Sequence, residues 1–490
     1  MSEHDKDFQP VADRPLDIYC IAIGGTGMAP LACLLQELGH RVRGSDGPLY
    51  PPMSTLLENA GIRPLVGFDP AHLEPAPDLV VVGNAVSRGN SEAEAAEERG
   101  LERISMPQAL DRFLLAGRRP LVVAGTHGKT TTTAMSAWVW SACGQDPGYL
   151  IGGLPHDLPE SFHRGGGERF IIEGDEYNAA YFDRGPKFLH YRPQTVILTS
   201  VEYDHVDLYP SPEALTDAFR RLIRLLPADG LAVAWGDDPA VRRVAEEAAC
   251  AVRTYGLAES NDLFPIGAVE TRPDGTRVRL HDEEAGEVTL HLRLPGHHNL
   301  LNALAAWTAA RADGLPAAAV ADALGRFRGV RRRLDELGTA GGVTVVEDFA
   351  HHPTAVMRTL EAVAQRYPGR RRVVLFEPRT NSAGRELFHD AYRLAFTGAD
   401  VVLFAPIFHA GRLAPEERLD LQELAAELQR IGVSAHACAD NEALLATALE
   451  SLRPGDVVLT MSSGAFDRLP HRLLAVLQQP QADQARLEQA

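Results

Sequence analysis

The chain has 490 residues, of which 45% are apolar and 23% are charged, as in ordinary globular proteins. At roughly 150 residues per domain, this length predicts about three domains. The formal net charge of −18 argues against a nucleic-acid partner, which would need a basic face. No apolar stretch approaches the roughly 20 residues that cross a bilayer, and the polar N-terminus has no signal-peptide core. We therefore expect no membrane partner and a cytoplasmic protein.

The first predicted domain spans residues 15–117. It contains three buried strands, at 18–23, 40–46 and 79–84. A glycine turn and a helix follow the first strand, and the second strand ends in Asp46, about twenty residues after the glycines. This order predicts a Rossmann-like nucleotide-binding domain, although Ala22 stands where a strict G-x-G-x-x-G pattern has its first glycine.

The second predicted domain spans residues 118–333. Its strands are expected at 120–124, 169–173, 195–200 and 231–235. They alternate with helices, which is typical of a parallel sheet covered on both faces, here of the P-loop ATPase type. Short alternating runs within 262–293 predict a small antiparallel insert, and a helix is expected from about 299 to 313.

The third predicted domain spans residues 334–478. Strands are expected at 343–347, 372–376, 400–404 and 456–460. Because they again alternate with helices, we predict a second Rossmann-like α/β unit. Residues 479–490 are rich in Gln and Ala and are predicted to form a flexible tail.

A phosphate-binding loop is predicted directly after the strand at 120–124. Its residues are Gly125, Thr126, His127, Gly128, Lys129, Thr130 and Thr131. Backbone N–H groups at a helix start favour an anion, Lys129 would contact the β- and γ-phosphates, and Thr130 would bind Mg²⁺. Lys129 is one of only three lysines in the chain. The loop is a shortened relative of the usual pattern, since Val123 stands where a glycine is expected.

Two clusters of polar residues follow neighbouring strands of the second domain. Glu173 ends one strand, where a carboxylate beside the phosphate loop is placed to hold Mg²⁺. Asp204 and His205 follow the strand at 195–200 and suit a second metal or a phosphoryl group. The structural alternatives are an acidic turn for Glu173 and an ordinary buried histidine for His205.

Further candidates lie at the start of the predicted helix at 299–313 and in the third domain. Asn299 and Asn302 share one helix face and are candidates for adenine or phosphate contacts, although Asn299 could instead cap the helix. The arginines at 331–333 are either a solvated run or a clamp on the γ-phosphate. In the loop at 377–382, Arg379 is a natural carboxylate reader.

Together these segments resemble the Mur ligases, ATP-dependent amide-forming enzymes of cell-wall synthesis. The residues that carry the resemblance are the phosphate loop at 125–131, Glu173 with Asp175-Glu176, Asp204-His205, His298-Asn299 with Asn302, Arg332-Arg333, and Asp348 with His351-His352-Pro353. They occur in the family's order across nearly the whole chain. The Gly24-Gly25-Thr26-Gly27-Met28 turn looks like the UDP-sugar-binding turn of members that act on UDP-N-acetylmuramate.

The resemblance implies a role for each domain: the first binds the UDP-sugar, the second binds ATP and Mg²⁺, and the third binds a peptide. Lys129, Glu173 and His205 would be catalytic, and Thr130, Glu173 and His205 would bind metal. ATP would contact the phosphate loop and His298, Asn299, Asn302, Arg332, Asp348 and His351. The UDP-sugar would contact Gly24, Gly25, Thr26, Gly27, Met28, Ser45, Asp46 and Asn84. The peptide would contact Arg379, Asn381 and Ser382.

Several stretches of the sequence resemble those of the family members that join UDP-N-acetylmuramate to L-Ala-γ-D-Glu-meso-diaminopimelate in peptidoglycan recycling. The alternative is the family member that adds free L-alanine. Asn178 departs from the first pattern, where an aspartate is expected. Some Mur ligases also carry a carbamylated lysine about fifteen residues after the His205 equivalent, which is impossible here because no lysine follows Lys187. We expect a monomer or weak homo-oligomer.

Two other classes of function remain open from the sequence. The first domain could bind a dinucleotide as part of an oxidoreductase, which the substitution at Ala22 disfavours. The phosphate loop could also belong to a non-catalytic nucleotide switch that signals through the third domain.

Overall fold

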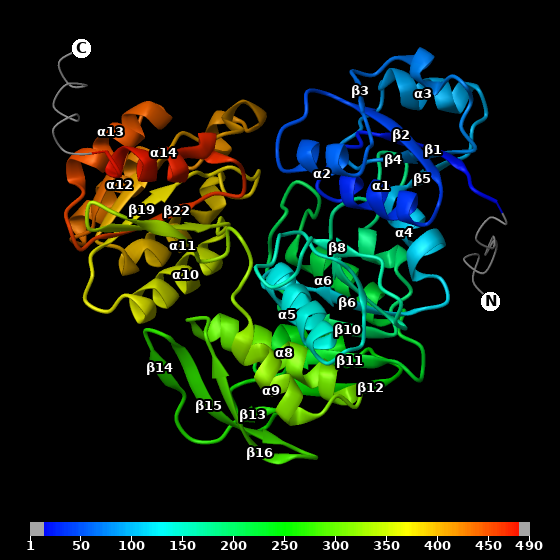
Figure 1. Ribbon diagram of the computed structural model, residues 1–490. Coiled ribbons are helices and arrows are strands. Elements are labelled where there is room, and N and C mark those ends of the chain that lie inside the picture. Colours follow the sequence, from blue (N-terminus) through cyan, green and yellow to red (C-terminus); the bar gives the residue numbers. More distant parts are fainter. Residues whose placement is uncertain (1–13, 480–490) are drawn as a thin grey trace.

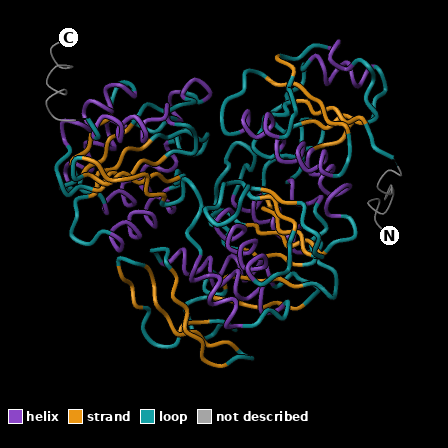
Figure 2. The backbone as a smooth tube through the Cα atoms, in the orientation of Figure 1, coloured by secondary structure: helices purple, strands orange, loops and turns teal. Residues whose placement is uncertain are grey.

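The computed structural model describes residues 14–479, and it divides them into three units that each contain a mainly parallel sheet (Figure 1). The predicted tail at 479–490 lies outside the described residues, apart from Gln479. Figure 2 shows the strands gathered at the centre of each unit with helices around them. The α/β fold class predicted from the sequence is confirmed.

The N-terminal unit is a five-stranded parallel sheet with the order β3-β2-β1-β4-β5. The strands are β1 (Asp17–Ile21), β2 (Arg41–Asp46), β3 (Leu65–Val66), β4 (Leu79–Val82) and β5 (Arg103–Ser105). The helices are α1 (Met28–Glu37), α2 (Met53–Asn59), α3 (Ser91–Glu98) and α4 (Met106–Leu110). The strand order reverses between β1 and β4, the point at which Rossmann-like sheets bind ligands. The glycine turn after β1 lies at this point.

A buried carboxylate holds the layers of this unit together. Glu92 of α3 is fully buried and accepts hydrogen bonds from the Tyr19 hydroxyl at 2.9 Å and from the Ser45 hydroxyl. The His72 ring lies 2.8 Å from the same carboxylate, and the Asp69 backbone N–H donates to it at 3.1 Å. Glu92 therefore links the first two strands to the segment that precedes α3.

We expect Glu92→Ala to lower the free energy of unfolding of the N-terminal unit by about 3–5 kcal/mol, because it leaves several buried donors without an acceptor. Glu92→Gln keeps an acceptor oxygen and should cost less. Urea denaturation of both variants measures the difference. A loss below about 1 kcal/mol in the alanine variant would contradict this role.

The central unit is a seven-stranded sheet with the order β12-β11-β10-β6-β9-β7-β8, in which only β8 is antiparallel. The strands are β6 (Arg119–Ala124), β7 (Gly148–Leu150), β8 (Phe162–His163), β9 (Arg169–Gly174), β10 (Thr195–Leu198), β11 (Leu231–Trp235) and β12 (Ala251–Tyr255). The helices are α5 (Lys129–Ala142), α6 (Pro212–Ile223), α7 (Pro239–Ala245), α8 (His297–Ala312) and α9 (Ala317–Arg326). The four strands predicted for this domain are all present. Because β6 lies between β9 and β10, the loop after it is flanked by the ends of both strands.

The predicted antiparallel insert is also present, at the lower edge of the molecule in Figure 1. Its strands are β13 (Phe264–Pro265), β14 (Glu270–Arg272), β15 (Gly275–Asp282) and β16 (Gly286–Leu292). Gln365 of the C-terminal unit donates a hydrogen bond to the Gly275 carbonyl at 3.0 Å, so the insert touches that unit.

The C-terminal unit is a six-stranded sheet with the order β17-β18-β22-β19-β20-β21, in which β17 is antiparallel. The strands are β17 (Asp335–Ala340), β18 (Val343–Asp348), β19 (Arg372–Phe376), β20 (Val401–Phe404), β21 (Ser434–Ala437) and β22 (Val457–Met461). The helices are α10 (Pro353–Arg366), α11 (His389–Ala395), α12 (Leu421–Arg430), α13 (Asn441–Ser451) and α14 (Leu469–Leu477).

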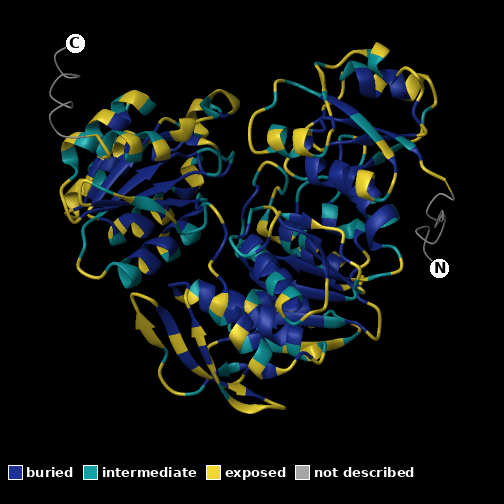
Figure 3. Cartoon of the chain, viewed as in Figure 1, coloured by how far each residue is buried: buried dark blue, intermediate teal, exposed yellow. Residues whose placement is uncertain are grey.

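The central strands of each sheet are buried and the outer helix faces are exposed (Figure 3). Within residues 14–479, no helix combines the length and the apolar character needed to cross a membrane.

Candidate active site

The loop after β6 has the backbone of a phosphate cradle. Gly125 and Gly128 have φ angles of 129° and 82°, which residues other than glycine rarely adopt. A Cβ on Gly125 would lie 2.3 Å from the Thr199 hydroxyl oxygen, and one on Gly128 would lie 2.6 Å from Oδ1 of Asn302. Gly128 precedes α5, so the free N–H groups of that helix face the loop.

Lys129 lies in this loop with its ammonium group between backbone and carboxylate oxygens. Its Nζ donates to the Gly125 carbonyl at 2.7 Å and to both oxygens of Glu176 at 2.9 Å. Burial by itself lowers the pKa of Lys129, but the Glu176 and Asp175 carboxylates raise it above its usual value. Lys129 is therefore positively charged at neutral pH.

Glu176 is a site residue to which the sequence analysis gave no role. It is 1% exposed and also accepts a hydrogen bond from Nε2 of His205 at 2.9 Å. Burial lowers the pKa of His205, whereas Glu176 and Asp204 raise it above its usual value. The sequence signals for Glu176 were its place just after the strand that ends in Glu173 and its presence among the residues that carry the family resemblance.

Thr130 and Glu173 meet on the other side of Lys129. The Thr130 hydroxyl donates to Glu173 Oε2 at 3.1 Å, and the Gly152 backbone N–H donates to Oε1 at 2.5 Å. Burial raises the pKa of Glu173 above its usual value. A hydroxyl and a carboxylate oxygen in contact are ligands that suit Mg²⁺. His205, the third predicted metal ligand, contacts Glu176 and not these two residues.

Arg333 is the arginine of the 331–333 run that contacts Thr130. Its guanidinium donates to the Thr130 hydroxyl at 3.3 Å, and burial lowers its pKa while Asp348 and Glu173 raise it. Arg332, which we predicted as an ATP contact, donates to Glu347 at 2.9 Å and to the Ser462 carbonyl at 3.0 Å. The positive φ of Arg332 (62°) turns the chain here, so neighbouring side chains point apart. Arg332 still lines the large cavity together with Lys129, so its contact with ATP stays a prediction, and Arg333 is added as the arginine that reaches Thr130.

Asp348 and His351 lie where the C-terminal unit meets the central one. Asp348 accepts hydrogen bonds from the backbone N–H groups of Leu334 and Ala350, both at 2.7 Å, and burial raises its pKa. Nε2 of His351 lies 3.7 Å from Asp204. Both residues line the same large cavity as Lys129.

The residues predicted at the start of α8 are brought against the phosphate loop. Asn302 is the side chain nearest to Gly128, and Asn299 accepts a weak hydrogen bond from it at 3.5 Å. Asn299 donates to the Pro295 carbonyl at 2.8 Å, while Gly296 occupies the cap position, so the alternative of Asn299 as helix cap is wrong. Burial lowers the pKa of His298 to about 3.

A second cluster joins His127, Glu202 and His352 across the boundary between the central and C-terminal units. Nε2 of His127 lies 3.0 Å from Glu202 Oε2, and the Thr354 hydroxyl also donates to this carboxylate. The His127 and His352 rings are 4.8 Å apart. The ligand atoms of the three residues lie within 4.8 Å of one another, so they could also hold a metal ion. Burial by itself raises the pKa of Glu202, but the His127 hydrogen bond and neighbouring charges lower it to about 2.

We expect His352 to make the protein less stable in acid. Burial lowers its pKa to about 4, so the folded state keeps it neutral while the unfolded state binds a proton below about pH 6.5. Its contribution to the free energy of unfolding therefore falls by about 2 kcal/mol between pH 7 and pH 5. His352→Asn keeps a helix cap before α10 and should remove that part of the pH dependence. Urea denaturation at both pH values tests this, with the exposed His436→Asn as control; an unchanged pH dependence in His352→Asn would contradict it.

The predicted UDP-sugar residues are arranged around the turn after β1. Asp46 accepts from the backbone N–H of Gly24 at 2.7 Å, so the acid stabilises the turn itself. Gly25 and Thr26 are exposed, as is Asn84 after β4, whereas Met28 is buried.

Ser45 does not fit its predicted role. Its side chain is fully buried and its hydroxyl donates to Glu92, because it lies within strand β2 and faces α3. The prediction that the Ser45 side chain contacts the sugar nucleotide is corrected.

A large cavity of about 1450 Å³ connects the units. It is lined by Thr26 and Gly27 of the N-terminal unit, by the phosphate loop, and by Arg333, Asp348 and His351. Lys187 lines it too, and its Nζ lies 2.7 Å from Asp175. One continuous space therefore runs from the glycine turn to the C-terminal unit.

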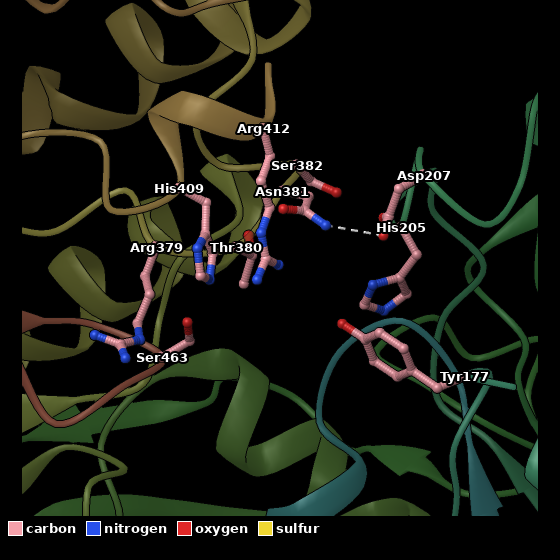
Figure 4. A pocket seen from close by; sticks show the side chains of 10 residues that line it. All are labelled: Tyr177, His205, Asp207, Arg379, Thr380, Asn381, Ser382, His409, Arg412 and Ser463. Carbon is pink, nitrogen blue, oxygen red and sulfur yellow. Dashed lines mark hydrogen bonds between the residues drawn. The ribbon is translucent and has the colours of Figure 1, made fainter. Parts of the chain in front are cut away.

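A smaller cavity of about 210 Å³ lies between the central and C-terminal units (Figure 4). The three predicted peptide-binding residues, Arg379, Asn381 and Ser382, all line it. Asn381 donates to Asp207 of the central unit at 3.0 Å. Four residues line both cavities: Tyr177, His205, Thr380 and Ser463.

Family models match three consecutive parts of the chain. The Mur ligase family catalytic domain matches residues 17–118, the Mur ligase middle domain matches 123–310, and the Mur ligase glutamate ligase domain matches 332–464. The chain belongs to the Mur ligase family. It is therefore an ATP-dependent ligase that forms amide bonds, and not an oxidoreductase or a non-catalytic switch.

Individual relatives of this Mur ligase match it over almost their full length. The UDP-N-acetylmuramate–L-alanyl-γ-D-glutamyl-meso-2,6-diaminoheptandioate ligase of Escherichia coli K12 is 39% identical over 93% of this chain and 97% of its own. The UDP-N-acetylmuramate–L-alanine ligase of Oleidesulfovibrio alaskensis is 36% identical, over 92% and 96%. The crystal structure of a murein peptide ligase from Psychrobacter arcticus superposes with a TM-score of 0.72 at 33% identity, over 95% and 99%.

Proposed function

We propose that this Mur ligase joins UDP-N-acetylmuramate to the tripeptide L-Ala-γ-D-Glu-meso-diaminopimelate in peptidoglycan recycling. The observation that carries the proposal is the 39% identity to the Escherichia coli ligase of that name over nearly the whole of both chains. The smaller cavity supports it, since Arg379 and Arg412 give that cavity a cationic wall for an acidic peptide.

In the proposed reaction, the lactyl carboxylate of the sugar nucleotide attacks the γ-phosphate of ATP, giving an acyl phosphate and ADP. The free amine of the peptide then attacks the acyl carbon, the amide forms, and phosphate leaves. Lys129, held as a cation by Glu176, would stabilise the charge on the transferred phosphoryl group. Arg333 would supply a second cation from the linker between the central and C-terminal units.

Magnesium fits the pair of oxygen ligands formed by Thr130 and Glu173, and when bound it would neutralise phosphate charge. Glu173, whose pKa burial raises, would bind the cation as a carboxylate. A carbamylated lysine has no counterpart, because the corresponding region holds the buried Phe219 and Arg220, which pairs with Asp217 and Glu247. We propose that the Glu176 carboxylate orients His205 in its place.

The second candidate is ligation of free L-alanine, which the 36% identity to an L-alanine ligase supports. Phosphate release from ATP with UDP-N-acetylmuramate, measured with the tripeptide and with L-alanine, separates the two. We expect release to depend on the tripeptide, with a kcat/KM at least about 100-fold higher than with L-alanine, as two lost charged contacts would give. A preference for L-alanine would overturn the proposed substrate. We also keep a cytoplasmic location and a monomeric or weakly associating state as proposals.

A further inference from the structure

The smaller cavity has two chemically different ends. Tyr177, His205, Thr380 and Ser463 line both this cavity and the large one. Of these, Tyr177 and His205 lie on the central unit, and His205 shares the Glu176 carboxylate with Lys129, so their end is the one beside the phosphate loop. The residues that line only the smaller cavity include Arg379, His409 and Arg412. Figure 4 shows these three side chains grouped on the C-terminal unit, across the cavity from Tyr177 and His205. An acceptor amine must lie at the first end, where it can meet the acyl phosphate.

Of Arg379, His409 and Arg412, Arg412 is the residue whose positive charge has no acidic or hydrogen-bonding partner among the described residues. Among residues 14–479, its guanidinium makes no hydrogen bond or ion pair, whereas Arg379 stacks on Phe408 at 3.6 Å and lies 3.4 Å from Glu377. Arg412 belongs to the short helical turn Ala410–Arg412 after β20 and is exposed. Its charge is also felt by His409, whose pKa is lowered first by burial and then by Arg412 and Arg379.

The position of this cation selects among acceptors by length. In L-alanine one carbon separates the amine from the carboxylate, so an alanine held at the Tyr177 and His205 end keeps its carboxylate at that end. The third residue of a peptide, with its amine held at the same place, extends toward the opposite wall. The Arg412 guanidinium lies on that wall and has no partner in the described part of the chain, so it is free to bind a carboxylate of the peptide in a bidentate manner.

We propose that Arg412 determines acceptor specificity by binding a carboxylate of the third residue of the acceptor peptide. The inference rests on the proposed function and names a residue that discriminates a murein tripeptide from shorter acceptors. Arg379, fixed by Phe408 and Glu377, forms the wall beside it. Arg412 touches substrate only at this distal point, so it contributes to binding rather than to phosphoryl transfer.

The test compares Arg412→Ala with wild type in steady-state kinetics, using L-Ala-γ-D-Glu-meso-diaminopimelate and the dipeptide L-Ala-γ-D-Glu as acceptors. We expect the variant to raise KM for the tripeptide about 10- to 100-fold, with kcat changed less than about threefold, and to leave KM for the dipeptide unchanged. Arg412→Lys should recover part of the loss. Arg430→Ala, which removes an exposed arginine of α12, is the matched control for net charge.

The outcomes separate the inference from the proposed function. A wild-type protein that ligates L-alanine and not the tripeptide overturns the proposed function. If the wild-type protein ligates the tripeptide, two results for Arg412→Ala overturn only the role of Arg412. The first is a KM for the tripeptide equal to that of wild type, and the second is an equal rise in KM for the tripeptide and the dipeptide. A tripeptide with lysine as its third residue locates the contact. If Arg412→Ala still raises KM for that peptide, Arg412 binds the C-terminal carboxylate of the third residue; if KM no longer rises, it binds the side-chain carboxylate of diaminopimelate. Either result supports the third residue as the partner of Arg412.

Discussion

Lys129→Met is expected to reduce ATP-dependent ligation by at least about 10³-fold, the largest effect among the variants considered. Lys129 is the cation that contacts the backbone of the proposed phosphate loop, since its Nζ donates to the Gly125 carbonyl. Its removal withdraws charge stabilisation that exists mainly while the phosphoryl group is transferred, so kcat should fall more than the KM for ATP rises. Phosphate release under saturating ATP measures this.

A control is needed because Lys129 also neutralises Glu176, which is 1% exposed. Removing the lysine alone leaves a buried carboxylate with one partner fewer, which is expected to cost about 3–5 kcal/mol of stability. The double variant Lys129→Met/Glu176→Gln removes both charges and should restore most of the stability but none of the activity. Near-normal turnover in a folded Lys129→Met protein would refute the role of Lys129 as the phosphate-contacting residue.

Arg333→Ala is expected to lower kcat/KM about 10²- to 10³-fold. Loss of one preorganised hydrogen-bond donor that faces charge developing in a transition state has an effect of this size. The guanidinium reaches Thr130 from the segment that links the central and C-terminal units, so it couples the position of the C-terminal unit to the phosphate site. Its removal should affect the phosphoryl-transfer step and leave binding of the sugar nucleotide unchanged. Single-turnover formation of ADP measures that step directly.

Arg331→Ala is the matched control for Arg333, since it removes the same group two residues earlier from an exposed position. We expect it to retain at least about half of the wild-type activity, because Arg331 is exposed at the large cavity while the hydrogen bond to Thr130 comes from Arg333. If Arg331→Ala and Arg333→Ala lose activity equally, the effect is one of overall charge and the assignment of Arg333 is wrong. Arg332→Ala should mainly lower stability, because that side chain holds Glu347 and the carbonyls of Ser462 and Gly464.

The local sequence was sufficient for the elements and for the phosphate loop. The apolar run before Gly125 predicts β6, and the positive φ angles at Gly125 and Gly128 strongly favour glycine. Strand, loop and helix can therefore be recognised without tertiary information. The antiparallel insert was likewise predictable from its alternating pattern at period two. Family resemblance added the order of the domains and the class of reaction.

Contacts between distant segments could be decided only by the tertiary structure. Which arginine of the 331–333 run faces Thr130 depends on the backbone turn at Arg332, and Glu176 acquires its role because β9 brings it beside Lys129 and His205. Ser45 lies in a strand whose buried face cannot be assigned from residue type, so its pairing with Glu92 was not predictable. A sequence shows composition and periodicity along one chain. The side chains that meet at this site come from segments as much as 203 residues apart, and packing of the folded chain places them.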